Sequence, residues 1–207
     1  KNVLKVSIAP FGLTFSPTIT MFLMNRFLLL HGNEQSVAVY SCIGYVVSII
    51  YLLLQGVGDG SQPLISHYYG ENNSVEVKHV RNMAYRAAFA VTVVCMVGLF
   101  LTRFHVGILF GASDETNLDV AVYLPLFLAT LLFLAYVRIT TAYFYATEKI
   151  KLSYLLVYSE PLLSLMFMLL LPQRLGLLGV WLAVPLAQVL AWCVSVVCQI
   201  YLSRTKQ

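Results

Sequence analysis

The chain has 207 residues, of which 59% are hydrophobic and 11% are charged, with a mean hydropathy of +0.81 and a formal net charge of +4. A water-soluble domain carries about 25% charged residues, so this composition excludes an ordinary soluble protein and indicates a lipid bilayer as the medium. The first residue is Lys rather than Met, and no signal-peptide pattern precedes the first apolar run, so we expect a segment of a longer protein.

Six apolar runs, each long enough to cross a bilayer at about 20 residues per crossing, follow one another along the chain. They cover residues 3–30, 36–67, 82–104, 118–147, 152–172 and 177–203. Because unpaired backbone groups are costly in lipid, runs of this length favour helices over buried strands. The sequence therefore predicts an all-α membrane protein, a bundle of six transmembrane helices in which residues 1–207 form one unit.

The connections between the runs are short and carry turn chemistry. Residues 31–35 and 70–76 contain Gly and Asn, and 172–176 form a Pro/Gly loop. Ser113 stands just before two acidic residues, which predicts a helix N-cap with acids in the first turn. Residues 147–151 read as a tight charged hinge. No connection is long enough to separate soluble domains.

The Lys and Arg residues of short loops set the orientation of a membrane protein. Those on one side are Lys1, Lys5, Lys78, Arg81, Arg86, Lys149, Lys151, Arg204 and Lys206, and those on the other are Arg103 and Arg174. This asymmetry predicts a multi-pass protein of the plasma membrane with both ends of the chain in the cytoplasm.

The second run carries a polar stripe at helical spacing, formed by Ser41, Tyr45, Ser48, Leu52, Gln55, Asp59, Gln62 and Ser66. Polar residues within spans face protein or water rather than lipid, so the stripe predicts a face turned toward the lobe interior or a central cavity. Gln55, Asp59 and Gln62 are therefore candidate residues of a substrate or ion pathway. The alternative is that such residues form hydrogen bonds that hold neighbouring helices together.

Polar residues of the other runs add further pathway candidates, namely Asn25, Arg138, Tyr143, Glu160 and Gln188. A charge at membrane depth costs several kcal/mol and persists mainly where it is paired or functional. Arg138 and Glu160 are thus either a structural ion pair or groups that handle protons or ligands. Prolines within the runs permit bends, and we expect Pro63 and Pro161 to act as hinges.

Motifs for soluble enzyme chemistry are missing from the sequence. There is no phosphate-binding Gly-x-x-x-x-Gly-Lys-Ser/Thr loop, no metalloprotease or hydrolase motif, and no basic patch for nucleic acid. The four cysteines lie inside apolar runs, without metal-ligand spacing. We therefore expect no enzyme activity, no metal, no cofactor and no nucleic-acid partner.

Three ordered motifs resemble a known transporter family. QGVGDGSQPLISHYYGENN (55–73) is similar to the end of the eighth helix of multidrug and toxic compound extrusion (MATE) transporters. FYATEKIKLSYLL (144–156) resembles the hinge between their tenth and eleventh helices, and GLLGVWLAVPLAQ (176–188) resembles the start of their last helix. With six spans in the expected orientation, the resemblance covers the whole chain.

The resemblance implies that the chain is the C-terminal six-helix lobe of a twelve-helix transporter, partnered by an N-terminal lobe of the same protein. Members of the family export small organic cations by alternating access, in exchange for Na⁺ or H⁺. One branch places acidic residues on the seventh and tenth helices, whereas here the first span has none and the fourth has only Asp119. A coupling site in this lobe would then depend on Asp59 or Glu160.

Two other functions fit the sequence less closely. A lipid-linked oligosaccharide flippase of the same superfamily would require several cationic cavity residues, and the spans offer only Arg26 and Arg138. A membrane scaffold that transports nothing would use the polar stripes as a closed, dry, hydrogen-bonded core.

Overall fold

The chain is a bundle of long α-helices. The computed structural model describes residues 2–204, with side chains for residue 12 and residues 15–202, and contains no strand in that range. The helices are α1 (Asn2–His31), α2 (Glu34–Gly70), α3 (Ser74–Thr102), α4 (Val106–Leu109), α5 (Asp114–Leu128), α6 (Leu131–Ala146), α7 (Ile150–Leu170), α8 (Pro172–Leu175) and α9 (Leu177–Arg204).

The six expected spans correspond to α1, α2, α3, the α5–α6 pair, α7 and α9. By length and hydropathy, α2, α3, α7 with α8, and α9 can each cross a membrane, and the bent α5–α6 pair adds a fifth crossing among the residues described in full. α1 is the sixth long helix, and the side chains of most of its first half lie outside the described set. Large apolar side chains cover the outside of the bundle; examples are Leu101, Val94 and Phe22. Such an apolar exterior suits lipid rather than water.

Side-chain caps place the starts of three helices. Asn33, Asn73 and Ser113 each accept a hydrogen bond from the backbone amide three residues later, at the starts of α2, α3 and α5. The cap predicted at Ser113 is therefore confirmed. The cap at Asn73 starts α3 eight residues before the expected span at 82, because a helix with a good cap extends beyond its apolar part.

The fourth span is broken rather than continuous. α5 and α6 meet at an angle of 45° across Ala129 and Thr130, four residues after Pro125. The Thr130 amide bonds to the Phe127 carbonyl at 3.2 Å, and its hydroxyl donates to the same carbonyl at 2.8 Å. The tighter turn and the hydroxyl thus satisfy backbone groups that the break would otherwise leave unpaired.

Pro63 and Pro161 each lie inside an unbroken helix. α2 runs through Pro63 and through the preceding glycines to Gly70, and α7 runs through Pro161 to Leu170. These glycines are helical in this conformation, although a glycine inside a helix costs about 1 kcal/mol relative to alanine. The role of the two prolines as hinges stays a prediction.

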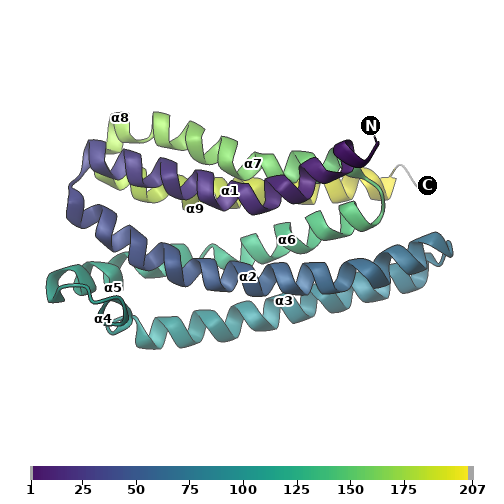
Figure 1. The fold of residues 1–207 in the computed structure, drawn as a ribbon, viewed down its shortest axis with the longest axis horizontal. Helices are drawn as coiled ribbons and strands as arrows, with labels where there is room; N and C mark the ends of the chain where they lie inside the picture. Colours follow the sequence, from purple (N-terminus) through teal and green to yellow (C-terminus); the bar gives the residue numbers. More distant parts are fainter. Residues whose placement is uncertain (1, 205–207) are drawn as a thin grey trace.

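The bundle is tighter at one end than at the other. Both termini, the α2–α3 turn and the α6–α7 turn lie at the same end, and α4, α5 and α8 lie at the opposite end (Figure 1). α1 and α2 meet near α5 and separate toward the termini (Figure 1). The main core surrounds Trp181, which stacks on Tyr123 at 4.3 Å and contacts Tyr40 and Phe127 edge-on or tilted.

Candidate functional site

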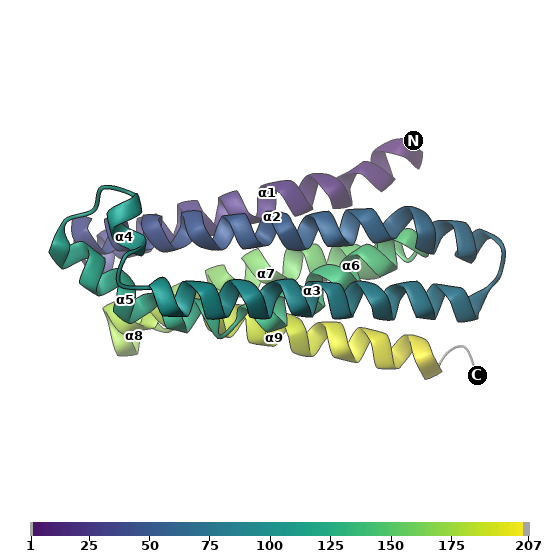
Figure 2. The ribbon, with the colours of Figure 1, turned by 90° about the horizontal axis from the view of Figure 1, so that it is seen from below.

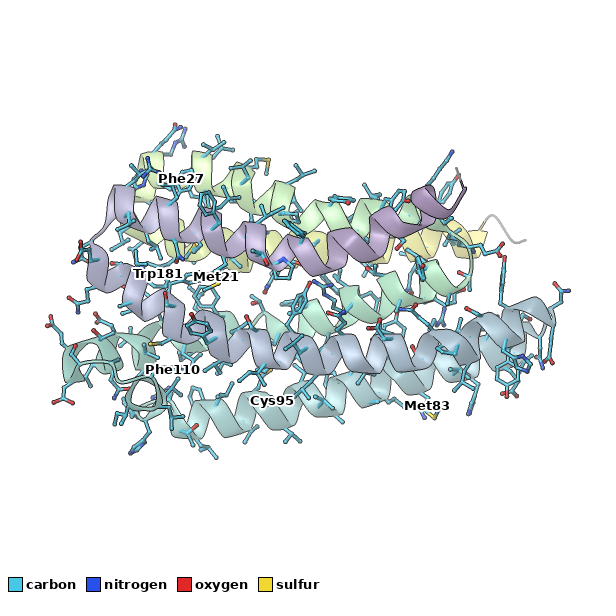
Figure 3. The ribbon with its side chains drawn as sticks, in the orientation of Figure 1. Met21, Phe27, Met83, Cys95, Phe110 and Trp181 are labelled. Carbon is cyan, nitrogen blue, oxygen red and sulfur yellow. The ribbon has the colours of Figure 1, made fainter. Side chains whose placement is uncertain are left out.

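A cavity of about 170 Å³ lies between α1 and α2, on the side where these helices diverge. Its walls come from α1, α2, the broken α5–α6 helix, α7 and α9, and its lining includes Met21, Tyr40, Ser48, Tyr51, Phe127, Glu160 and Gln188. Figure 3 shows Met21 of α1 between α1 and α2. Ser48 at the rim is exposed, so the cavity reaches the surface of the lobe.

The break in the fourth span borders this cavity. Phe127 lies just before the break and Leu134 just after it, and both line the wall. On the facing wall, Pro17 interrupts the hydrogen bonding of α1 and is followed by Thr18. Irregular helices at membrane depth are tolerated where they line a cavity, and binding sites of transporters are built in this way.

Glu160 and Arg138 form an ion pair at the cavity wall. Arg138 Nη2 lies 3.8 Å from Glu160 Oε2, and the side chains are 7% and 13% exposed. The Arg138 guanidinium also stacks 3.7 Å from the centre of the Tyr51 ring. The sequence left a structural pair and a functional pair open. The geometry fits a structural ion pair between Arg138 and Glu160. The 3.8 Å contact is long, however, and Arg138 has a second partner in Tyr51.

Several buried polar atoms around the cavity have no hydrogen-bond partner in the described part of the chain. They are Thr20 Oγ1 on α1, Arg138 Nη1 on α6 and Gln188 Oε1 on α9. A buried polar group without a partner costs about 1–3 kcal/mol, so such groups mark places where water or a ligand is bound. Two of the three are oxygen acceptors. Together with the Glu160 carboxylate they form a polar wall in an otherwise apolar and aromatic cavity.

The α2 stripe lies on an exposed flank of the lobe rather than in its interior. The buried ridge of α2 runs through Ile43, Ile50, Leu54 and other residues on the opposite side of the helix. Within the stripe, Asp59 is exposed and accepts a hydrogen bond from Gln62 Nε2 at 3.0 Å, and Gln55 is partly exposed. Of the two orientations that the sequence left open, the stripe therefore does not face the interior of this lobe, and its orientation toward a central cavity between two lobes stays a prediction.

The other predicted site residues separate into two places. Gln188 lines the cavity, and its role in a substrate or ion pathway stays a prediction. Asn25 lies one helical turn beyond Met21 on α1, and its Oδ1 is buried without a partner among the described residues. Tyr143 lies near the terminal end of the bundle, where the Arg81 guanidinium sits 5.2 Å from its ring centre. Asp59, Gln62 and Tyr143 are thus not part of the cavity lining.

Sequence reasoning missed Tyr51 and Thr20. Tyr51 follows Ser48 by one turn, so it adjoins the polar stripe, but it was not recognised because aromatic residues at this spacing also occur in cores. Thr20 stands three residues after Pro17, and the Pro-Thr-Ile-Thr sequence was the available signal. The pairing of Tyr51 with Arg138 joins α2 to α6, and no pattern within a single helix encodes it.

A family model named MatE matches residues 10–170 of the chain. The chain belongs to the MatE family. It is thus a multi-pass membrane protein with a transporter fold, and members of this family are transporters rather than enzymes. No sequence match is found among curated proteins.

Solved MATE structures show the same fold. An outward-facing multidrug resistance MATE transporter of the MOP superfamily superposes with a TM-score of 0.87 at 21% identity over 99% of this chain and 46% of its own. An inward-facing one gives 0.83 at 20% identity over 100% and 48%. A MOP superfamily transporter from Pyrococcus furiosus, described as having a binding pocket of reversed polarity that suggests a different function, gives 0.88 at 21% over 99% and 47%. The chain spans about half the length of these proteins.

Proposed function

We propose that this MatE chain is one lobe of a proton-coupled exporter of organic cations, and that Glu160 is the carboxylate on which proton and substrate compete. The observation that carries the proposal is a largely buried carboxylate, 13% exposed, at the wall of a cavity that also presents Tyr40, Tyr51 and Phe127. Aromatic faces and a carboxylate attract cations, and a loosely packed apolar wall accepts varied shapes. No catalytic step is involved.

The Arg138 contact favours a proton over Na⁺ as the coupling ion. A Na⁺ ion near Glu160 would also meet the positive guanidinium 3.8 Å away, so the local field offers it little attraction. A proton binds the carboxylate itself and removes its charge. Arg138 then keeps its contact with Tyr51, which reduces the cost of losing its acidic partner.

The fold supports transport by movement of whole lobes. The chain superposes well on both an outward-facing and an inward-facing transporter, with TM-scores of 0.87 and 0.83. A lobe that keeps its fold in both states acts as a rigid body against its partner, which is how alternating access works in proteins built from repeats. The partner lobe, the substrate and the plasma-membrane location are parts of this proposal.

No observation supports either of the two alternative functions, the flippase or the scaffold. For the flippase, Arg26 is exposed on α1 and Arg138 is paired with Glu160, so the described lining of the cavity offers no cluster of free cations for a pyrophosphate. For the scaffold, the α2 stripe is expected in a closed, dry core, whereas it lies exposed with Ser48 at the rim of a cavity.

The test uses the full-length protein in proteoliposomes with a fluorescent aromatic cation, ethidium, as the transported probe. We expect a pH gradient to drive ethidium transport, a Na⁺ gradient alone not to drive it, and Glu160→Gln to lower the pH-driven rate at least about tenfold. Asp59→Asn is the matched control, because this carboxylate lies on the exposed flank. Unchanged pH dependence in Glu160→Gln, with loss in Asp59→Asn, would assign coupling to Asp59 instead.

A further inference from the structure

A second hollow lies on the other side of α6, between α3 and α9. At the terminal end of the bundle it forms a basic pocket of about 370 Å³, lined by Lys78, Arg81, Tyr143, Lys149, Gln199 and neighbouring apolar residues. One to two turns farther from that end, the same three helices form a mostly apolar groove of about 510 Å³, lined by Arg86, Phe89, Phe133, Tyr136, Trp192 and others. Figure 2 shows α3 and α9 on this face with α6 behind them.

The hollow exists because the core divides at this end. Ile65, Val77, Val80 and Ala146 form one small cluster between α2, α3 and the end of α6. Phe144, Leu156 and Cys198 form another between α6, α7 and α9. Between the two clusters, α3 and α9 separate toward the termini (Figure 2). The basic pocket lies in this gap, and its walls include the apolar residues Phe144, Ile200 and Leu202.

The pocket is cationic and partly preorganised. Lys78, Arg81 and Lys149 line it, and no Asp or Glu does. Within the described residues, no carboxylate lies within 4.0 Å of Lys78 or Arg81, and Glu148 is exposed. Arg81 is held over the Tyr143 ring at 5.2 Å, and its buried Nε has no hydrogen-bond partner in that part of the chain. This guanidinium therefore has a donor to offer to an anion.

A hydrogen-bonded floor joins the pocket to the groove. Tyr85 and Thr140 hydroxyls lie 2.7 Å apart, Tyr136 donates to Gln199 Oε1 at 3.1 Å, and Gln199 donates to Tyr85 and Thr140. The network ties α3, α6 and α9 together at one level. Tyr136 to Tyr143 on α6 and Trp192 to Gln199 on α9 both span seven residues, about 10 Å at 1.5 Å per residue. The basic pocket thus lies about 10 Å along the bundle from the aromatic groove.

We propose that this hollow binds an anionic phospholipid, with its phosphate in the basic pocket and an acyl chain along the aromatic groove. The arrangement matches the molecule: a negative headgroup at the end of a membrane helix bundle, followed by an apolar slot at greater depth. Basic pockets between membrane helices at a cytoplasmic surface recognise anionic headgroups. The hollow is separated from the Glu160 cavity by α6, so the proposal does not rest on the transport assignment.

The test measures lipid retention by native mass spectrometry of the full-length protein in detergent, with phosphatidylglycerol and phosphatidylcholine of the same chain length as probes. We expect phosphatidylglycerol to be retained preferentially, and each of Lys78→Gln, Arg81→Gln and Lys149→Gln to weaken its retention about fivefold. The matched control is Arg103→Gln with Arg174→Gln at the opposite end, which we expect to leave retention unchanged. Trp192→Ala is expected to weaken retention of both lipids.

Three outcomes would overturn the proposal. They are equal retention of the two lipids, equal loss in the opposite-end control, and full displacement of phosphatidylglycerol by millimolar inorganic phosphate, which would indicate a site for a soluble anion. Because Arg81 packs on Tyr143, Arg81→Lys is included to keep the charge and Lys78→Gln with Lys149→Gln to avoid that contact. Photo-crosslinking of a phosphatidylglycerol analogue must then label peptides of α3 and α9 in the unmodified protein.

Discussion

At the scale of single residues, Arg138 has two partners of different kinds. It lies 3.8 Å from Glu160 and 3.7 Å from the centre of the Tyr51 ring, and it is 7% exposed. Removing one member of a buried ion pair leaves an uncompensated charge, whereas removing both members is often close to neutral. This contrast separates the structural contribution of the pair from its proposed role in transport.

Arg138→Met in the full-length protein is expected to lower the free energy of unfolding by about 3 kcal/mol, because Glu160 loses its partner. The double variant Arg138→Met with Glu160→Gln is expected to recover most of that loss. Thermal unfolding can be followed with a thiol-reactive dye, since Cys42 and Cys198 are buried and free. Additive losses in the double variant would mean that the two side chains do not interact as the structure places them.

Tyr51 is a residue whose place in the site could not be inferred from the sequence. Asn25, Glu160, Arg138 and Gln188 were recognised because polar groups are rare in apolar runs. Tyr51 was not, because an aromatic residue is as common in a packed core as at a binding site. Its importance arises from a contact between α2 and α6, which lie side by side only in the folded bundle.

At the scale of elements, close backbone approaches and helix breaks define the lobe. Gly179, in the first turn of α9, packs against the junction of α7 and α8. An added Cβ there would lie 2.5 Å from the carbonyl carbon of Leu171 and 2.7 Å from the nitrogen of Pro172. Gly98 lies near the end of α3, where an added Cβ would meet nothing within 4 Å. Substitution of the two glycines by alanine is therefore expected to change the stability of the bundle in opposite directions.

Gly179→Ala is expected to destabilise the full-length protein by about 1–3 kcal/mol, because the backbone of Leu171 and Pro172 cannot move aside easily. Gly98→Ala is expected to stabilise it by about 0.5–1 kcal/mol, since Ala loses less backbone entropy in a helix. The comparison is made on melting temperatures in one detergent. A Gly179→Ala protein as stable as the unmodified one would contradict the close packing of α7, α8 and α9.

At the scale of the whole molecule, sidedness follows from charge and topology together. Both termini and the α2–α3 and α6–α7 turns lie at one end (Figure 1), and Lys78, Arg81, Lys149 and Lys151 belong to that end. Arg103 and Arg174 belong to the other. The positive-inside rule therefore predicts that the termini lie in the cytoplasm.

Single cysteines introduced into a cysteine-free, full-length protein test this orientation. An impermeant maleimide applied to intact cells is expected to label Glu115→Cys, at the start of α5, and not Ser74→Cys or Lys151→Cys. Inverted membrane vesicles should give the reverse pattern, because only the accessible face changes. Labelling of all three from one side would contradict a crossing of the membrane by α3 and by the α5–α6 pair.

Hydropathy and capping are properties of short, contiguous segments. From these properties the sequence alone predicts the lipid environment, the helical class, five of the six spans as continuous helices, and the Ser113 cap. It also determined the family, through motifs at 55–73, 144–156 and 176–188. Only the tertiary structure divided the fourth span at residues 129–130 and turned the α2 stripe outward. It also brought Glu160, Arg138, Tyr51 and Gln188 around one cavity. These features depend on which helices pack side by side, and contacts between distant helices leave no periodic signal in any one of them.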